Sequence, residues 1–139
     1  MYLRKITSKK IKSGAPRSKN VLKSDSFNHA LAAAKLSSFH KGHNIRIFQV
    51  KEHCSYADYF VVVTATSTKH AQSLAHHLGQ KKVLSIEGLE KSNWVVIDLG
   101  EIVVHVFLEE TRSHYHFDKI WGHVPNEPYI EKTLSALKA

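Results

Sequence analysis

Residues 94–107 read WVVIDLGEIVVHVF, and this stretch restricts the fold of the chain more than any other. Two apolar runs rich in β-branched residues flank a short centre that contains Gly100, a pattern typical of a β-hairpin. The centre also places two carboxylates, Asp98 and Glu101, at the tip of the hairpin. Such a pair can hold a metal, carry out acid–base chemistry, meet a basic partner, or form an ordinary solvated turn.

A two-residue connection at Leu99–Gly100 would pair Asp98 with Glu101 and Trp94 with His105. Because side chains alternate along a strand, one face of the hairpin is wholly apolar and must point into the core. The opposite face is expected to point outward and is mixed: Trp94, Val96, Asp98, Glu101, Val103 and His105. This is the composition of a recognition surface with an aromatic anchor and a charged rim. The alternative is an ordinary solvent face that carries a tryptophan.

The acidity continues beyond the tip of the hairpin. Four acids and no Lys or Arg occur between residues 98 and 110, namely Asp98, Glu101, Glu109 and Glu110. Like charges directly opposite each other on a hairpin are mildly destabilising. The pattern is therefore easier to explain if a cation, from a metal or from a basic protein, meets these carboxylates.

The rest of the chain alternates between predicted helices and strands. Helices are expected from Ser24 or Ser26 to Gly42, from Thr66 or Ser67 through the segment 66–82, and over 109–122 and 129–139. Strands are expected over 45–50, 59–65 and 83–88, in addition to the hairpin. The run YFVVVTA at 59–65 is typical of a strand buried on both faces. The order predicts an α/β fold, a single domain with a mixed sheet flanked by helices.

The positive charge is confined to the beginning of the chain. Residues 1–24 contain eight of the 20 Lys and Arg residues and none of the 12 acids, so residues 25–139 are formally neutral. We expect this leader to be disordered in isolation. It can be a solvated tail, an RNA-binding tail that uses Lys9, Lys10, Lys12 and Arg17, or an organellar transit peptide.

Several features bear on the compartment. There is no run of about 18 apolar residues and no apolar region typical of a secretory signal. The single cysteine, Cys54, cannot form an internal disulfide, which fits a reducing compartment. We therefore expect a cytoplasmic protein, with a mitochondrion or plastid as the alternative if the leader is a transit peptide.

Three blocks of the sequence resemble the signature blocks of the ribosomal silencing factors, the RsfS/Iojap family. They are ADYFVVVTATSTKHAQSLAHHL, EGLEKSNWVVIDLGEIVVHVF and EETRSHYHFDKIWG, and their order and spacing match over the region from about Phe27 to Gly122. The resemblance implies an α/β domain similar to a nucleotidyltransferase fold without that activity. It also implies binding to the large ribosomal subunit through its fourteenth protein, which sterically blocks subunit joining and represses translation. Organellar relatives act in large-subunit assembly, and family members are commonly homodimers when free.

By resemblance, partner contact falls on Trp94, Tyr115, Asp98, Glu101 and His105. The sequence pattern adds Glu109 and Trp121, which continue the acidic and aromatic character of the same region. Ribosomal proteins are usually basic, so the acids can meet Lys and Arg side chains. The expected parts of the chain are a basic leader (1–24), the family domain (25–122) and a C-terminal extension (123–139).

The enzymatic rival is a nucleotidyltransferase. That chemistry needs a glycine-containing phosphate turn and closely spaced carboxylates for Mg²⁺. The corresponding segment TATSTKH has no glycine, no Asp-x-Asp pair follows it, and no P-loop motif occurs. Adjacent histidines on a helix, such as His76 and His77, point about 100° apart and do not easily share an ion. We predict a binding protein that is not an enzyme and has no cofactor or metal.

Overall fold

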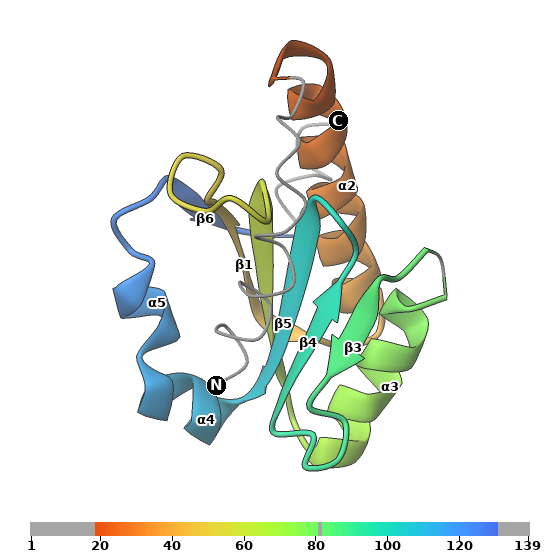
Figure 1. Ribbon diagram of the computed structural model, residues 1–139. Helices are drawn as coiled ribbons and strands as arrows, with labels where there is room; N and C mark the ends of the chain where they lie inside the picture. Colours follow the sequence, from red (N-terminus) through yellow and green to blue (C-terminus); the bar gives the residue numbers. More distant parts are fainter. Residues whose placement is uncertain (1–18, 81, 131–139) are drawn as a thin grey trace.

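Over the residues that it describes, 19–80 and 82–130, the computed structural model has one six-stranded sheet in the order β3-β4-β5-β2-β1-β6 (Figure 1). The strands are β1 (His43–Gln49), β2 (Tyr59–Ala65), β3 (Ser85–Glu87), β4 (Trp94–Asp98), β5 (Ile102–Leu108) and β6 (Asn126–Pro128). The helices are α2 (Lys19–Phe39), α3 (Thr68–Leu78), α4 (Glu109–Tyr115) and α5 (Phe117–Ile120). Strands β2 and β5 pair in parallel, and the other neighbouring strands pair antiparallel.

Helices cover both faces of this sheet and give three layers (Figure 1). Helices α2 and α3 pack on one face, where Ala34 and Leu74 belong to a first hydrophobic core. Helices α4 and α5 lie on the other face, where Phe117 belongs to a second core. The predicted α/β domain with a mixed sheet flanked by helices is confirmed.

Strand β2 lies in the interior of the sheet, between β5 and β1. All seven of its residues are buried, as the continuous apolar run predicts. Val61 and Val63 point into the first core, whereas Phe60 and Val62 point into the second. The run is apolar on both faces because helices cover both faces.

Strands β4 and β5 form the predicted hairpin, but their register is shifted by two residues. Asp98 pairs with Val103 and not with Glu101. The connection is the three residues 99–101, with Gly100 at a φ of 104°, a conformation that favours glycine. A shift of two residues leaves the side chains of both strands on their predicted faces, so the division of the strands into two faces is correct although the pairing is not. Glu101, predicted to share the face of Trp94, lies in the connection and contacts Ser26 on α2.

Helix α2 begins earlier than the sequence indicates. Ser24 and Ser26 lie within it, so neither is the predicted N-cap. The hydroxyl of Ser26 is buried and donates a 2.7 Å hydrogen bond to Asp58 Oδ2. The serine that looks like a local cap therefore has a tertiary partner, and the predicted end of the leader at residue 24 falls inside the helix.

The end of α2 also differs in detail. The helix ends at Phe39, before the predicted end at Gly42, and Lys41 takes the left-handed conformation with a φ of 68°. Gly42 donates its N–H to the Ser37 carbonyl at 2.7 Å. A Cβ at this position would lie 2.5 Å from Val63 Cγ1, so glycine is needed here for the close approach of the helix end to β2. Helix α3 follows the prediction, with Ser67 as its cap and a buried stripe of Ala71, Leu74, Ala75 and Leu78.

The C-terminal extension contributes a strand that the sequence does not indicate. Strand β6 pairs with β1 at the edge of the sheet and ends at Pro128. Proline is tolerated at an edge, where no further strand needs its missing N–H. Most of the predicted terminal helix lies outside the described residues. Among the helices described, none has the length and apolar character to cross a bilayer.

Candidate functional site

The hairpin face that carries Trp94 and His105 is buried, so the expectation that it points outward is wrong. Trp94 is 4% exposed, Asp98 2% and His105 0%. The face belongs to the second core, to which Phe117 of α5 and apolar residues of the loop after β1 contribute, and Tyr115 of α4 covers Trp94. A strand pattern shows which side chains share a face, but it does not show whether a later segment of the chain covers that face.

Trp94 is a central residue of the second core. Its ring lies 4.7 Å from that of Phe107, its partner across the hairpin, and 5.0 Å from that of Tyr115 on α4. Its Nε1–H donates a 3.1 Å hydrogen bond to Nδ1 of His105. The Tyr115 ring thus packs on the core side against Trp94, while Tyr115 itself is 37% exposed. The structure brings together three of the predicted site residues, but only Tyr115 reaches the surface.

His105 is held in its neutral form. Burial lowers the pKa of His105 to about 3. Because indole nitrogen only donates, Nδ1 must be the acceptor for Trp94 and the ring proton lies on Nε2. Among the described residues Nε2 has no hydrogen-bond partner, and the edge-on Phe60 ring lies 4.8 Å away between centroids. The imidazole therefore acts as a core aromatic ring and as the acceptor that orients Trp94.

The four acids of the sequence do not form one patch. Asp98 and Glu101 lie at the tip of the hairpin, before β5 begins, whereas Glu109 and Glu110 follow the other end of β5. A seven-residue strand separates the two pairs by roughly 20 Å. Glu109 and Glu110 are exposed, and Asp98 is buried. The acidic character therefore divides into two places on the molecule.

The carboxylates at the tip take part in local structure. Asp98 Oδ1 accepts a 3.0 Å hydrogen bond from the Gly100 N–H and so closes the turn. Glu101 Oε1 accepts a 3.3 Å hydrogen bond from Ser26 on α2. Within the described ranges, no group of three or more His, Cys, Asp and Glu side chains has the arrangement to hold a metal ion. The His77 ring stacks on that of His40 with 3.6 Å between centroids, and the His76 ring lies edge-on to His77 at 5.4 Å.

Helices α4 and α5 and the residue after α5 carry exposed and half-buried side chains, namely Glu109, Glu110, Tyr115, Ile120 and Trp121, and we call this set the α4–α5 surface. Glu109 and Glu110 lie beside His43 and Thr64, whereas the Tyr115 ring lies on Trp94. Ile120 is 58% exposed, and Trp121 is half-buried against Phe60 at 5.0 Å between rings. Aromatic and apolar groups beside carboxylates are the composition of a protein-binding surface.

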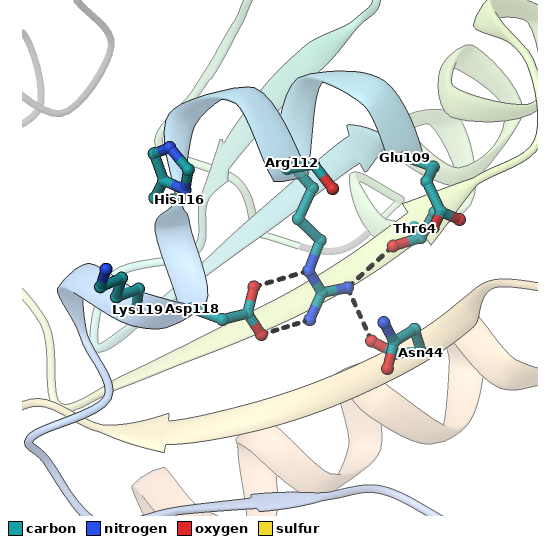
Figure 2. A pocket seen from close by; sticks show the side chains of 8 residues that line it. Asn44, Thr64, Glu109, Arg112, His116, Asp118 and Lys119 are labelled. Atoms are coloured by element: carbon teal, nitrogen blue, oxygen red, sulfur yellow. Dashed lines mark hydrogen bonds and ion pairs between the residues drawn. The ribbon is translucent and has the colours of Figure 1, made fainter.

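Arg112, which the sequence does not single out, forms the centre of a polar cluster below this surface. Figure 2 shows its guanidinium pointing from α4 toward Asp118, Thr64 and Asn44. The side chain is almost fully buried and lies beside a pocket of about 400 Å³ between α4, α5 and the strands β1 and β2. Arg112 and Asp118 are six residues apart, which is not a helical spacing, so the sequence pattern carries no signal for their pairing.

The fold and the surface define an α/β domain whose exposed aromatic and acidic groups suit protein binding. A sequence model of the family described as ribosomal silencing factor during starvation matches residues 23–138. The chain therefore belongs to the ribosomal silencing factor family, as the three sequence blocks indicate.

Individual relatives agree with this assignment. The chain is 42% identical over 77 residues to ribosomal silencing factor RsfS of Halalkalibacterium halodurans, a match that covers 50% of this chain and 64% of that protein. It is 33% identical over 87 residues to mitochondrial assembly of ribosomal large subunit protein 1 of Mus musculus, covering 56% of this chain and 38% of that protein. The family thus includes bacterial silencing factors and a mitochondrial ribosome assembly protein.

The fold matches solved structures. A crystal structure of a Bacillus halodurans protein superposes with a TM-score of 0.61 and 28% identity, covering 74% of this chain and 97% of that one. The described strands and helices are therefore those of a known architecture.

Proposed function

We propose that this protein binds the large ribosomal subunit through its fourteenth protein, blocks subunit joining by excluded volume and so represses translation without catalysis. The observation that carries this proposal is the α4–α5 surface, where the partly exposed Tyr115 ring packs on the buried Trp94 ring and Glu109 and Glu110 of the same helix are exposed. Family membership supplies the ribosomal context. A role in large-subunit assembly is the alternative, which the mouse relative's name supports.

The roles of the residues in this surface differ from those that the sequence indicates. Tyr115 is the aromatic contact residue, and Trp94 supports it from the core. Glu109 and Glu110 can meet Lys or Arg side chains of a basic partner and favour encounter. Asp98, Glu101 and His105 act through the fold in this proposal, since they lie at the hairpin tip or in the core. Self-association in the absence of ribosomes, which the family resemblance implies, belongs to the same proposal.

The first test is replacement of Tyr115 by alanine. We expect Tyr115→Ala to weaken binding to purified large subunits by about 30-fold, because an interface aromatic hot spot is worth about 2 kcal/mol. Co-sedimentation over a range of large-subunit concentrations measures the affinity. Subunit-joining assays with added small subunits then show whether binding also excludes the small subunit.

Two variants control for the Tyr115 experiment. Tyr115→Phe keeps the ring on Trp94 and should retain most of the affinity. Phe39→Ala removes a more exposed aromatic side chain, 77% accessible, at the end of α2 on the opposite layer of the molecule. Unchanged binding by Tyr115→Ala, with normal folding, would show that the α4–α5 surface is not the docking site.

The role of the leader in ribosome binding is tested by varying the salt concentration. Deletion of residues 1–18 removes six Lys and Arg residues and leaves α2 intact. If the leader lies along ribosomal RNA, the deletion should reduce the slope of log affinity against log salt concentration, because fewer counterions are released. Equal slopes for the two chains would leave the leader as a targeting or passive segment, and would leave the α4–α5 proposal unaffected.

A further inference from the structure

The side chain of Arg112 connects four elements of the fold. Its Nε and Nη2 donate to the two oxygens of Asp118 on α5, both at 2.8 Å. Its Nη1 donates to the Asn44 carbonyl on β1 at 2.7 Å and to Thr64 Oγ1 on β2 at 2.8 Å. Four of the five guanidinium N–H groups are therefore engaged, in a side chain that is only 7% exposed.

The two helices that Arg112 joins cannot hold their own arrangement. Helix α4 has seven residues and α5 has four, and helices this short are unstable without tertiary contacts. They meet at His116, which has a left-handed φ of 52° and breaks the helix between them. The angle between α4 and α5 must therefore be fixed by contacts outside the helices. Those contacts are the buried Phe117 ring and the two-pronged Arg112–Asp118 ion pair.

The joint divides the α4–α5 surface into two halves. Glu109, Glu110 and Tyr115 precede His116, whereas Ile120 and Trp121 follow it. The position of the second half relative to the first depends on the angle at the joint. A rotation there would move Ile120 and Trp121 relative to Tyr115 and would draw the Trp121 ring from its place 5.0 Å from the Phe60 ring on β2.

We infer that Arg112 is a positioning residue for partner binding: its fork with Asp118 sets the angle between α4 and α5 and so aligns the two halves of the docking surface. This inference rests on the proposed function of the α4–α5 surface. Asp118 is well suited to the pairing, because the hydrogen bond from Arg112 lowers its pKa and keeps it ionised. The planar guanidinium is required, since it can bond both carboxylate oxygens and two further acceptors at once, whereas an ammonium group cannot reproduce that geometry.

The deciding variant is Arg112→Lys, which keeps the charge and the aliphatic stem but removes the guanidinium that bonds both oxygens of Asp118. We expect two results. The amide hydrogens of Ile120 and Trp121, which bond within the α5 turn to His116 and Phe117, should exchange faster, while β2 and β5 amides stay protected. Large-subunit affinity should fall by about ten-fold, the loss expected when part of a hot spot is misplaced.

The matched control is Arg46→Lys. Arg46 also donates from Nε to an oxygen, that of the Asn126 side chain at 2.7 Å, and so ties β1 to the edge strand β6. Its positive charge also acts on Asp118, and lysine retains that charge, so this variant removes only the guanidinium. Its replacement should leave both α5 exchange and large-subunit affinity unchanged. If Arg112→Lys does not fold, Asp118→Asn serves instead, because it keeps one acceptor oxygen and removes the second prong.

The outcomes separate the two proposals. Faster α5 exchange with unchanged affinity, in a chain whose Tyr115→Ala variant does lose affinity, would overturn the positioning role alone. Unchanged α5 exchange in Arg112→Lys would overturn it regardless of any ribosome measurement. Unchanged affinity in Tyr115→Ala would overturn the proposed docking surface, and with it the reason for positioning.

Discussion

Replacement of Trp94 by alanine should destabilise the protein by about 3–5 kcal/mol, the range found for large-to-small changes of buried aromatic residues. Trp94 is 4% exposed and contacts the rings of Phe107, Tyr115 and Phe117. The change would leave a cavity in the second core and leave Nδ1 of His105 without its donor. The unfolding midpoint should fall by about 10 °C or more in a domain of this size, as measured by thermal denaturation followed by circular dichroism.

Two variants show which property of Trp94 matters. Trp94→Phe keeps most of the ring packing and removes the N–H, so it should cost much less than the alanine change. Trp121→Ala removes the half-buried tryptophan, whose ring is partly solvated, and should also cost less. A Trp94→Ala protein as stable as the parent would contradict the burial of this side chain.

This expectation changes how binding experiments are read. Loss of ribosome binding in Trp94→Ala would follow from a damaged core even if Trp94 never touches a partner. Tyr115→Ala removes an exposed ring and leaves the core in place, so it is the variant that tests contact.

Acid should destabilise the protein through His105. The pKa of His105 is lowered from 6.5 to about 3 by burial, so between these values the unfolded chain binds a proton that the folded chain does not. Above pH 6.5 the imidazole is neutral in both states and gives no pH dependence, and as the pH falls below 6.5 proton binding favours the unfolded chain and lowers the free energy of unfolding. Between pH 7 and pH 5 the free energy of unfolding should drop by about 2 kcal/mol from this residue alone. Urea denaturation at a series of pH values measures it.

The comparison variant is His105→Asn. Its side-chain oxygen can accept the Trp94 N–H near the position of Nδ1, and it does not titrate in this range. Other titrating groups are common to both proteins, so the difference between their pH profiles isolates His105. We expect a shallower profile for the variant below pH 6.5, and parallel profiles would show that His105 is not buried in its neutral form.

Much of the fold follows from local sequence patterns. Polar and apolar residues do not alternate in the run at 59–65, which is typical of a strand covered on both faces. Strand β2 is such a strand. Ser67 before the stripe of Ala71 and Leu74 predicts the start and the buried face of α3. The family blocks identify the family correctly. These features depend on residues that are close together in the chain, and their periodicity is therefore visible in the sequence.

The candidate site was less predictable, because its arrangement depends on segments far apart in the chain. The alternation of the hairpin correctly places Trp94, Val96 and His105 on one face, but α4, α5 and the loop after β1 bury that face. Asp98 and Glu109 belong to one acidic stretch of sequence. In the structure Asp98 lies near the beginning of β5 and Glu109 directly follows its end, so the strand separates them. Ser26 looks like a helix cap and instead bonds to Asp58, 32 residues away.

The sequence by itself determined the alternation of helices and strands, the two faces of the hairpin and the membership of the family, since each of these is encoded in short-range spacing. The tertiary structure alone decided that both faces of the hairpin are buried, that Trp94 is the core tryptophan, and that Arg112 joins Asp118, Thr64 and Asn44. Thr64 and Asn44 lie 48 and 68 residues from Arg112. Burial and long-range pairing depend on what the rest of the chain packs against a residue, and no local pattern specifies that.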